Sequence, residues 1–169
     1  MNYEQARAYA VNVSRSGSIL GLDSIENLMH ELGDIQERLK IIHIAGTNGK
    51  GSTGAYLERV LIEAGYRVGR YSSPAVFDPM EVWRINLQSM SHEEYADIME
   101  QVKCACDRMV EKGMEHPTIF EVETAMAFLY FYQKKCDYVL LEVGMGGRTD
   151  ATNLIKKPVC SVITSVSMD

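Results

Sequence analysis

The stretch from Ile41 to Thr53, IIHIAGTNGKGST, carries an apolar run into a loop of three glycines and one lysine. The apolar run, within residues 39–45, predicts a buried strand. The residues after the loop, 52–66, space their apolar side chains at helical intervals, so they predict a helix that Gly65 ends. We expect its buried face to hold Ala55, Leu57, Val60, Leu61 and Ala64. A strand, a glycine-rich loop and a helix in this order are typical of an α/β fold.

The rest of the chain continues this alternation. The further predicted strands lie at 66–73, 80–87, 137–143 and 159–166, and the further predicted helices at 3–13, 91–112 and 118–135. Another helix is expected after the break at 16–22, with Asp23 or Ser24 as its cap. The last two strands are almost entirely apolar, which is typical of strands covered by helices on both faces. We therefore expect a P-loop NTPase-like, doubly wound and mostly parallel sheet flanked by helices, with no domain boundary inside the chain.

Composition narrows the class of protein. With 169 residues, 46% of them hydrophobic and 24% charged, the chain resembles a folded globular protein rather than a disordered or fibrous one. The 17 basic and 23 acidic side chains leave a formal charge of −6, which disfavours a nucleic-acid partner. The start lacks a signal-peptide pattern, and no apolar run reaches the roughly 18 residues that span a bilayer. We therefore expect a cytoplasmic protein without a membrane partner, whose four cysteines are reduced thiols.

The loop from Gly46 to Ser52 is the first candidate for a binding site. In open α/β sheets, ligands bind beyond the carboxyl ends of strands, where this loop is expected. Glycines allow backbone N–H groups to point at an anion, the following helix start adds partial positive charge, and Lys50 could reach nucleotide phosphates. The strict P-loop pattern is not met, since Ile44 stands at its first glycine position and Gly51 follows the lysine. A plain flexible turn is the alternative.

Two further segments follow strand ends. In DYVLLEVGMGGRTDATN, residues 137–153, Glu142 ends a central strand, where a buried acid is costly unless it is paired or binds a metal. It resembles the acidic Mg²⁺ partner of P-loop enzymes, and the alternative is an acid held by backbone N–H groups. Arg148 and Asp150 suit either ligand approach or internal pairing. In YSSP, residues 71–74, a serine again follows a strand, and a solvated turn is the simpler interpretation.

Together these segments resemble the folylpolyglutamate synthase and dihydrofolate synthase family of Mur-type ATP-dependent ligases. The motifs that carry the resemblance are HIAGTNGKGST, YSSP with Glu81 and Arg84 downstream, PTIFEVETAMAF, LLEVGMGGRTDATN and VITSVSMD, in the family's order over nearly the whole chain. GTNGKGS is the form that the P-loop takes in this family, so the extra Gly51 is a family feature. Residues 1–169 are accordingly expected to form the amino-terminal part of a Mur-type ATP-binding domain.

The resemblance implies a role for residues at each motif. The expected ATP-binding residues are Gly46, Thr47, Asn48, Gly49, Lys50, Gly51 and Ser52. Lys50 and Glu142 are expected to act in catalysis, and Ser73 and Glu142 to bind Mg²⁺. The residues expected to contact the pterin-bearing substrate are Thr118, Ile119, Phe120, Glu121 and Thr149. The family's reaction joins L-glutamate to a folate or dihydropteroate carboxylate, which ATP first converts to an acyl phosphate.

Two departures and the length of the chain qualify the resemblance. The family often has SPH and a later ER; here Ala75 replaces the histidine and Val82 replaces the arginine. The resemblance therefore does not assign substrate contacts to the loop after Ser73. The family's sequences continue with a metal-binding histidine, a lysine and a carboxy-terminal domain. We therefore expect residues 1–169 alone to bind nucleotide weakly, to lack ligase turnover and to self-associate, whereas the full-length enzyme is expected to be monomeric. The alternatives are another P-loop enzyme, such as a small-molecule kinase, and a noncatalytic nucleotide-binding fragment.

Overall fold

The computed structural model describes residues 1–15 and 21–167, so most of the expected break at 16–22 and the last two residues of VITSVSMD lie outside the description. The helices are α1 (Tyr3–Ser14), α2 (Asp23–Glu31), α3 (Lys50–Glu63), α4 (His92–Glu111) and α5 (Ile119–Gln133), with short 3-10 helices η1 (Ile35–Arg38), η2 (Pro79–Val82) and η3 (Ala151–Leu154). The strands are β1 (Ile41–Ala45), β2 (Val68–Tyr71), β3 (Trp83–Ile85), β4 (Gln88–Ser89), β5 (Tyr138–Glu142) and β6 (Cys160–Ile163). Among the helices of the described ranges, none is long and apolar enough to cross a membrane.

One six-stranded sheet, of order β4-β3-β2-β5-β1-β6, organises the described residues. β2, β5, β1 and β6 are parallel neighbours, and β3 and β4 extend the sheet in antiparallel fashion. β5 lies inside the sheet, and its Val139, Leu140 and Leu141 are at most 1% exposed. The expected mostly parallel sheet flanked by helices is therefore confirmed, and the apolar run of β5 agrees with its coverage on both faces.

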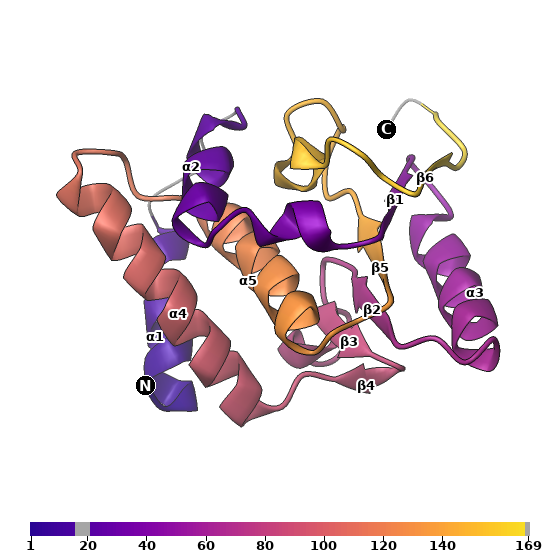
Figure 1. The fold of residues 1–169 in the computed structure, drawn as a ribbon, viewed down its shortest axis with the longest axis horizontal. Helices are drawn as coiled ribbons and strands as arrows, with labels where there is room; N and C mark the ends of the chain where they lie inside the picture. The colour runs from indigo at the N-terminus through magenta and orange to yellow at the C-terminus, as the bar shows by residue number, and fades with distance from the viewer. Residues whose placement is uncertain (16–20, 168–169) are drawn as a thin grey trace.

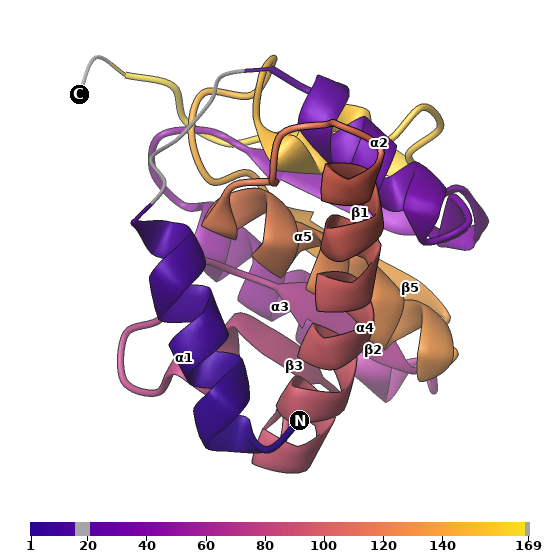
Figure 2. The same ribbon diagram turned by 90° about the vertical axis from the view of Figure 1, so that its left-hand side faces the viewer.

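Helices cover the two faces of the sheet unequally. α3 lies on one face, whereas α5 packs on the other (Figure 1). α1 and α4 lie side by side outside α5 (Figure 2), and the main hydrophobic core fills the space between this helical layer and the sheet. A Cβ atom on Gly69 of β2 would lie 2.6 Å from Cδ1 of Phe131, so glycine allows α5 to approach the sheet closely. α5 is apolar nearly all round because sheet and helices surround it.

Capping explains where α5 begins and why the predicted cap of α2 is wrong. The side chain of Thr118 accepts a hydrogen bond from N of Glu121, and the Glu121 side chain accepts one from N of Thr118, which forms a capping box. In α2 the cap residue is Leu22, without a side-chain hydrogen bond, and Asp23 is already the first helical residue. Ser24 instead donates its hydroxyl to Oε2 of Glu121 over 3.2 Å, so this side chain ties α2 to α5.

The buried face of α3 also differs from the expected one. Val60 is 64% exposed and the two alanines of the expected face are exposed, while Gly54 and Glu58 are buried. The reason is Arg70 of β2, whose Nη1 donates to Oε2 of Glu58 over 3.2 Å. Its Nη2 donates to the carbonyl O of Gly51 over 2.8 Å. Leu57 and Leu61 pack partly buried against a second apolar cluster, as the periodicity predicted. The periodicity missed Glu58, because its contact is ionic.

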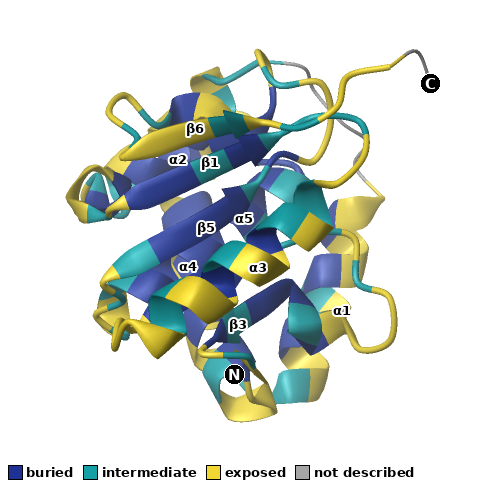
Figure 3. Cartoon of the chain, turned by 90° about the vertical axis from the view of Figure 1, so that its right-hand side faces the viewer, coloured by how far each residue is buried: buried dark blue, intermediate teal, exposed yellow. Residues whose placement is uncertain are grey.

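The outer strands are shorter than the sequence predicts. β6 is the edge strand beside β1, and its side chains are mostly exposed, with Ile163 at 74% (Figure 3). The expectation that helices cover both faces of this strand is therefore wrong for the described residues. The segment 80–87 begins as η2, because the side chain of Asp78 accepts a hydrogen bond from N of Met80, and becomes a strand only at Trp83.

We predict that Glu58→Ala lowers the free energy of unfolding by about 3–5 kcal/mol, because it leaves the buried Arg70 guanidinium without its ionic partner. Urea unfolding followed by circular dichroism measures the change. Glu37→Ala is the control, since Glu37 pairs with Lys156 at the surface and its removal should cost less than about 1 kcal/mol. Equal losses in the two variants would contradict the role of the buried pair.

Candidate functional site

Three neighbouring parallel strands end at one edge of the sheet. β2, β5 and β1 are adjacent, and Ile44 of β1 is level with Glu142 of β5. The loops that begin at this edge span residues 46–49, 72–78 and 143–150. Open α/β sheets bind ligands at such an edge, and each of these loops carries candidate residues from the sequence.

The glycine loop after β1 adopts backbone conformations that favour glycine. Gly46 has a φ of 137° and Gly49 has a φ of 86°, both in the left-handed region. A Cβ atom on Gly46 would lie 2.0 Å from Oγ1 of Thr164, so the loop also approaches the segment after β6 too closely for a side chain. Gly49 is the N-cap of α3 and Lys50 is its first residue, so the unbonded N–H groups of the first turn lie at the loop.

The ammonium group of Lys50 folds back over this loop. Its Nζ donates to the carbonyl O of Gly46 over 2.7 Å and to that of Thr47 over 3.3 Å. Both acceptors are neutral, so a phosphate oxygen would be a stronger partner for the same cation. Together with the N–H groups at the start of α3, the loop therefore fits the phosphates of a nucleotide.

The segment after β6 holds the glycine loop from its other side, a contact that the sequence did not reveal. The N–H of Thr47 donates to the carbonyl O of Ser165 over 2.8 Å, and Asn48 forms an isolated antiparallel bridge with Ser165. Oγ1 of Thr164 donates to the carbonyl O of Ala45 over 3.1 Å. The described part of VITSVSMD therefore fixes the backbone of the loop.

Glu142, at the end of β5, lies between the glycine loop and the loop after β2. Oγ of Ser72 donates to Oε2 of Glu142 over 2.5 Å. A Cβ atom on Gly51 would lie 4.0 Å from the same oxygen, so the carboxylate reaches the first turn of α3. Ser73, which the sequence paired with Glu142, is the next residue along the chain and lines a cavity.

The oxygen atoms at this junction suit Mg²⁺. In nucleotide sites this ion uses one or two protein oxygens and completes its shell with phosphate oxygens and water. No group of three or more His, Cys, Asp or Glu side chains placed to hold a metal occurs within residues 1–15 and 21–167. A metal that depends on phosphate oxygens therefore fits the junction better than one held by protein ligands alone.

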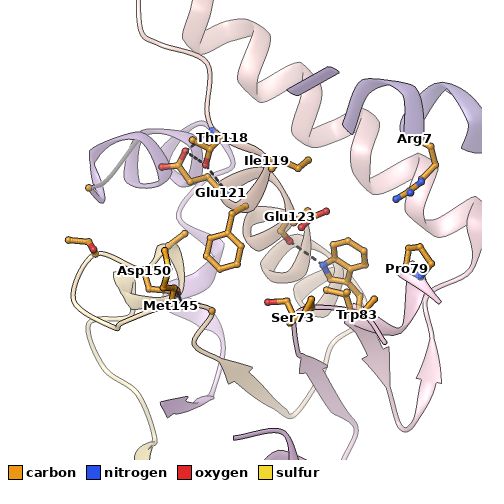
Figure 4. Close-up of a pocket in the computed structure, with 18 residues that line it drawn as sticks. Arg7, Ser73, Pro79, Trp83, Thr118, Ile119, Glu121, Glu123, Met145 and Asp150 are labelled. Carbon is orange, nitrogen blue, oxygen red and sulfur yellow. Dashed lines mark hydrogen bonds between the residues drawn. The ribbon is translucent and has the colours of Figure 1, made fainter. Parts of the chain in front are cut away.

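A cavity of about 540 Å³ adjoins this junction (Figure 4). The expected substrate residues all line it, namely Thr118, Ile119, Phe120, Glu121 and Thr149. Ser73, next to Ser72, and Gly144, two residues after Glu142, line it as well. The structure thus brings the expected substrate residues together in one cavity, next to the junction that the nucleotide loop also reaches.

Two acids of the cavity wall are held by their own segments. Oε2 of Glu121 accepts hydrogen bonds from N and Oγ1 of Thr118, over 2.7 and 2.9 Å. Asp150 accepts from N of Met145 over 2.8 Å and from N of Thr152 over 2.9 Å. Of the two interpretations of the loop after β5, internal pairing therefore describes Asp150. Both acids stabilise the wall through these bonds.

Arg7, Trp83 and Glu123 also line the cavity, and the sequence analysis did not identify them (Figure 4). Burial raises the pKa of Glu123 to about 7, and the positive charge of Arg7 opposes this only in part. Nε1 of Trp83 donates to the backbone O of Glu123 over 3.1 Å, which fixes the indole against α5. An acid inside an apolar helical run was the signal that could have identified Glu123.

The raised pKa of Glu123 predicts a pH-dependent stability. Its ordinary pKa is 4.5 and its folded pKa is about 7, so folding favours the protonated acid and stability falls as the pH rises between these values. Glu123→Gln removes this cost, which at about 1.4 kcal/mol per pKa unit amounts to at most about 3 kcal/mol. We expect the variant to melt at a higher temperature than the wild type at pH 8 and at a similar temperature near pH 4. Melting curves that shift equally with pH in both proteins would contradict the raised pKa.

No family model matches the chain. Its sequence is 39% identical over 168 residues to the dihydrofolate synthase/folylpolyglutamate synthase of Bacillus subtilis. This match covers 99% of the present chain and 39% of the relative. Its fold matches an FPGS–AMPPCP–folate complex with a TM-score of 0.91 at 36% identity, over 100% of this chain and 41% of the other. It matches a bifunctional folylpolyglutamate synthase/dihydrofolate synthase with Mn, AMPPNP and L-glutamate bound, with a TM-score of 0.86 at 38% identity, over 97% and 39%. The chain spans about two fifths of the length of these relatives.

Proposed function

Since the chain belongs to the folylpolyglutamate synthase and dihydrofolate synthase family, we propose that it forms the nucleotide- and pterin-binding part of an ATP-dependent ligase. The proposed reaction adds L-glutamate to the carboxylate of folate or dihydropteroate through an acyl phosphate. The observation that carries this proposal is that all five expected substrate residues line one cavity, whose wall reaches Ser73 and Gly144 beside the Glu142 junction. A substrate carboxylate and a nucleotide phosphate could therefore meet there.

In this proposal the loop from Gly46 to Ser52 binds the phosphates of ATP. Lys50 exchanges its neutral carbonyl partners for phosphate oxygens. Its positive charge then stabilises the negative charge of the phosphoryl group during transfer. Relatives with AMPPCP bound, and with Mn and AMPPNP bound, support a nucleotide and a divalent cation as cofactors. When bound, ATP with Mg²⁺ supplies the phosphoryl group that activates the carboxylate.

Glu142 and Ser73 are the proposed protein ligands of Mg²⁺. Glu142 stands within reach of the first turn of α3, and Ser73 lines the cavity on the other side of the junction. Ser72 orients the carboxylate of Glu142 through its hydroxyl. This arrangement supports a metal held between the nucleotide phosphates and the substrate cavity, because each ligand belongs to one of the two neighbouring sites.

The substrate side of the proposal rests on the cavity wall. Phe120 lies against Gly144, where a Cβ atom would come 2.7 Å from Cζ of the ring, so the absence of a side chain lets the ring occupy that place. An aromatic ring at the wall suits the flat ring system of a pterin. Structures of relatives with folate bound, and with L-glutamate bound, support these two substrates.

The place of the chain in a larger protein is also a proposal. We propose that residues 1–169 form the amino-terminal part of a Mur-type ATP-binding domain. We also propose that turnover requires the regions of the relatives that these residues do not cover. The greater length of the relatives supports this. We further propose a cytoplasmic location. The cysteines have free thiols, which supports this location because disulfides are rare in the cytoplasm. These cysteines are Cys104, Cys106, Cys136 and Cys160.

We predict that Lys50→Ala raises the dissociation constant for AMPPCP with Mg²⁺ at least about tenfold, because the loop loses its cation. Isothermal titration calorimetry measures the constant. The matched control is Arg59→Ala, which removes one positive charge from the exposed side of the same helix and should leave binding unchanged. If both variants weaken binding equally, the effect comes from net charge and the assignment of Lys50 to the phosphates is wrong.

We predict that Phe120→Ala weakens the binding of dihydropteroate at least about tenfold, because the cavity wall loses its aromatic face. AMPPCP binding should stay unchanged, since Phe120 lies outside the glycine loop. Phe77→Ala is the control, because Phe77 is 93% exposed. Equal affinity for dihydropteroate in the wild type and in both variants would show that the segment 118–121 was assigned wrongly.

A further inference from the structure

His43, in the middle of β1, is a polar side chain that the proposed function does not use. Its neighbours Ile42 and Ile44 belong to the smaller apolar cluster, which packs against α3. Because side chains alternate along a strand, His43 points to the opposite face of the sheet. There its Nε2 lies 2.9 Å from Oγ1 of Thr152 in η3, 109 positions later in the chain. The histidine therefore joins the strand that carries the glycine loop to the segment that follows the loop after β5.

The direction of each hydrogen bond follows from the groups involved. Oγ1 of Thr152 lies 2.5 Å from Oδ1 of Asp150, and because a carboxylate only accepts, the hydroxyl donates its single hydrogen there. The same hydroxyl oxygen therefore accepts from His43, whose Nε2 must carry the hydrogen. Thr152 is 0% exposed and Asp150 is 5% exposed, so solvent does not compete for these bonds. The bonds form one series, from His43 through Thr152 to Asp150.

Burial keeps the imidazole of this series neutral. It lowers the pKa of His43 below its ordinary value of 6.5, and the negative charge of Asp150 opposes the effect only in part. At neutral pH the ring is therefore uncharged and keeps its hydrogen on Nε2. The donor to Thr152 is thus present without a net positive charge on the ring.

Asp150 passes the constraint on to the wall of the cavity. Its other oxygen, Oδ2, accepts from N of Met145 over 2.8 Å, and the two residues lie side by side on the wall (Figure 4). A Cβ atom on Gly144 would lie 3.2 Å from the same oxygen and 2.7 Å from Cζ of Phe120. The loop backbone is thus packed closely between the carboxylate and the ring. A shift of Asp150 would therefore move the backbone against which Phe120 rests.

We propose that His43 is a positioning residue of the substrate site, which holds the loop after β5 in place through Thr152 and Asp150. This inference rests on the proposed function, because it assigns the effect to binding of the pterin-bearing substrate. His43 does not itself line the cavity, so it acts only through its neighbours. Since β1 leads into the glycine loop, the same strand anchors both proposed binding sites.

A role limited to the stability of β1 makes a different prediction. If the histidine only stabilised the strand, its loss would loosen the glycine loop as well, and affinity for nucleotide and for substrate would fall together. In the proposed role the loss is confined to the substrate, because the series of bonds leads away from the glycine loop. The donor rather than the shape of the ring carries the effect, so an amide of similar reach should replace the imidazole.

The test compares variants that differ in the hydrogen-bonding groups alone. In His43→Gln an amide N–H can take the place of the Nε2–H group, whereas His43→Met has a similar length and no donor. Thr152→Val keeps the shape of the threonine and removes its hydroxyl, and a double variant combines it with His43→Met. Glu115→Gln, which removes an exposed acid, is the control. Isothermal titration calorimetry measures the binding of dihydropteroate and of AMPPCP with Mg²⁺, and thermal unfolding establishes that each protein is folded.

We expect His43→Met to weaken dihydropteroate binding about fivefold, the typical effect of one lost hydrogen bond, and to leave AMPPCP binding unchanged. His43→Gln should bind dihydropteroate within about twofold of the wild type, because it keeps a donor. The double variant should bind it no more weakly than Thr152→Val, since the two residues act in series. Glu115→Gln should change neither affinity.

Nitrogen NMR of isotope-labelled histidine adds a measurement that needs no ligand. At neutral pH the His43 ring should be neutral with its hydrogen on Nε2, and its signals are identified by their absence in His43→Gln. Thr152→Val should change the balance between the two tautomers, because the acceptor of the Nε2–H group is lost.

Three results would overturn the inference and leave the proposed function standing. They are a His43 ring with its hydrogen on Nδ1, equal affinities of His43→Met and His43→Gln for dihydropteroate, and parallel losses of dihydropteroate and AMPPCP binding in His43→Met. If the wild type binds AMPPCP but not dihydropteroate, the proposed function is wrong and this inference falls with it.

Discussion

The guanidinium of Arg70 is the interaction on which the placement of the glycine loop depends. It crosses from β2 to α3 and donates both to the carboxylate of Glu58 and to the carbonyl O of Gly51. Gly54 leaves room for it, since a Cβ atom there would lie 3.2 Å from Nε. Because the pair is buried, any shift of the helix start would separate charges in a medium of low dielectric constant. The N–H groups of the first turn, which form part of the proposed phosphate site, are therefore held in one position relative to the sheet.

The charges around the junction also favour a divalent cation at the proposed site. Among the described residues, the hydrogen bonds of the Lys50 ammonium group go to neutral carbonyl groups of its own loop, so its charge is available to a phosphate. Glu142 reaches the same turn of α3 with a negative charge, which a phosphate group would meet at short range. Two anions at this distance repel each other unless a cation lies between them. The position of Glu142 is thus unfavourable for a nucleotide alone and favourable for a nucleotide with its metal.

The sequence predicted the parts of the fold that follow from local periodicity and known motifs. The buried run of β5, the glycine loop after β1 and the start of α5 at Thr118 all appear where the sequence places them. The errors have a different origin. The burial of Glu58 on α3 is set by Arg70, twelve residues later in the chain, and the hydroxyl of Ser24 bonds to a distant glutamate rather than to its own helix. Such contacts depend on the packed structure, so no local pattern reveals them.

The two acids near the start of α5 show how the same side chain takes different roles within one turn. Residues two apart on a helix point about 200° from each other, so Glu121 turns back to its cap and to Ser24, while Glu123 faces Arg7 and Trp83. Glu121 keeps hydrogen-bond donors from Thr118 and Ser24 in its buried position. Among the described residues no donor bonds to the carboxyl group of Glu123, so burial raises its pKa and folding favours its protonated form. The same residue type therefore serves as a cap at one position and as an acid of raised pKa two residues later, because only the first has hydrogen-bond donors to its carboxylate among the described residues.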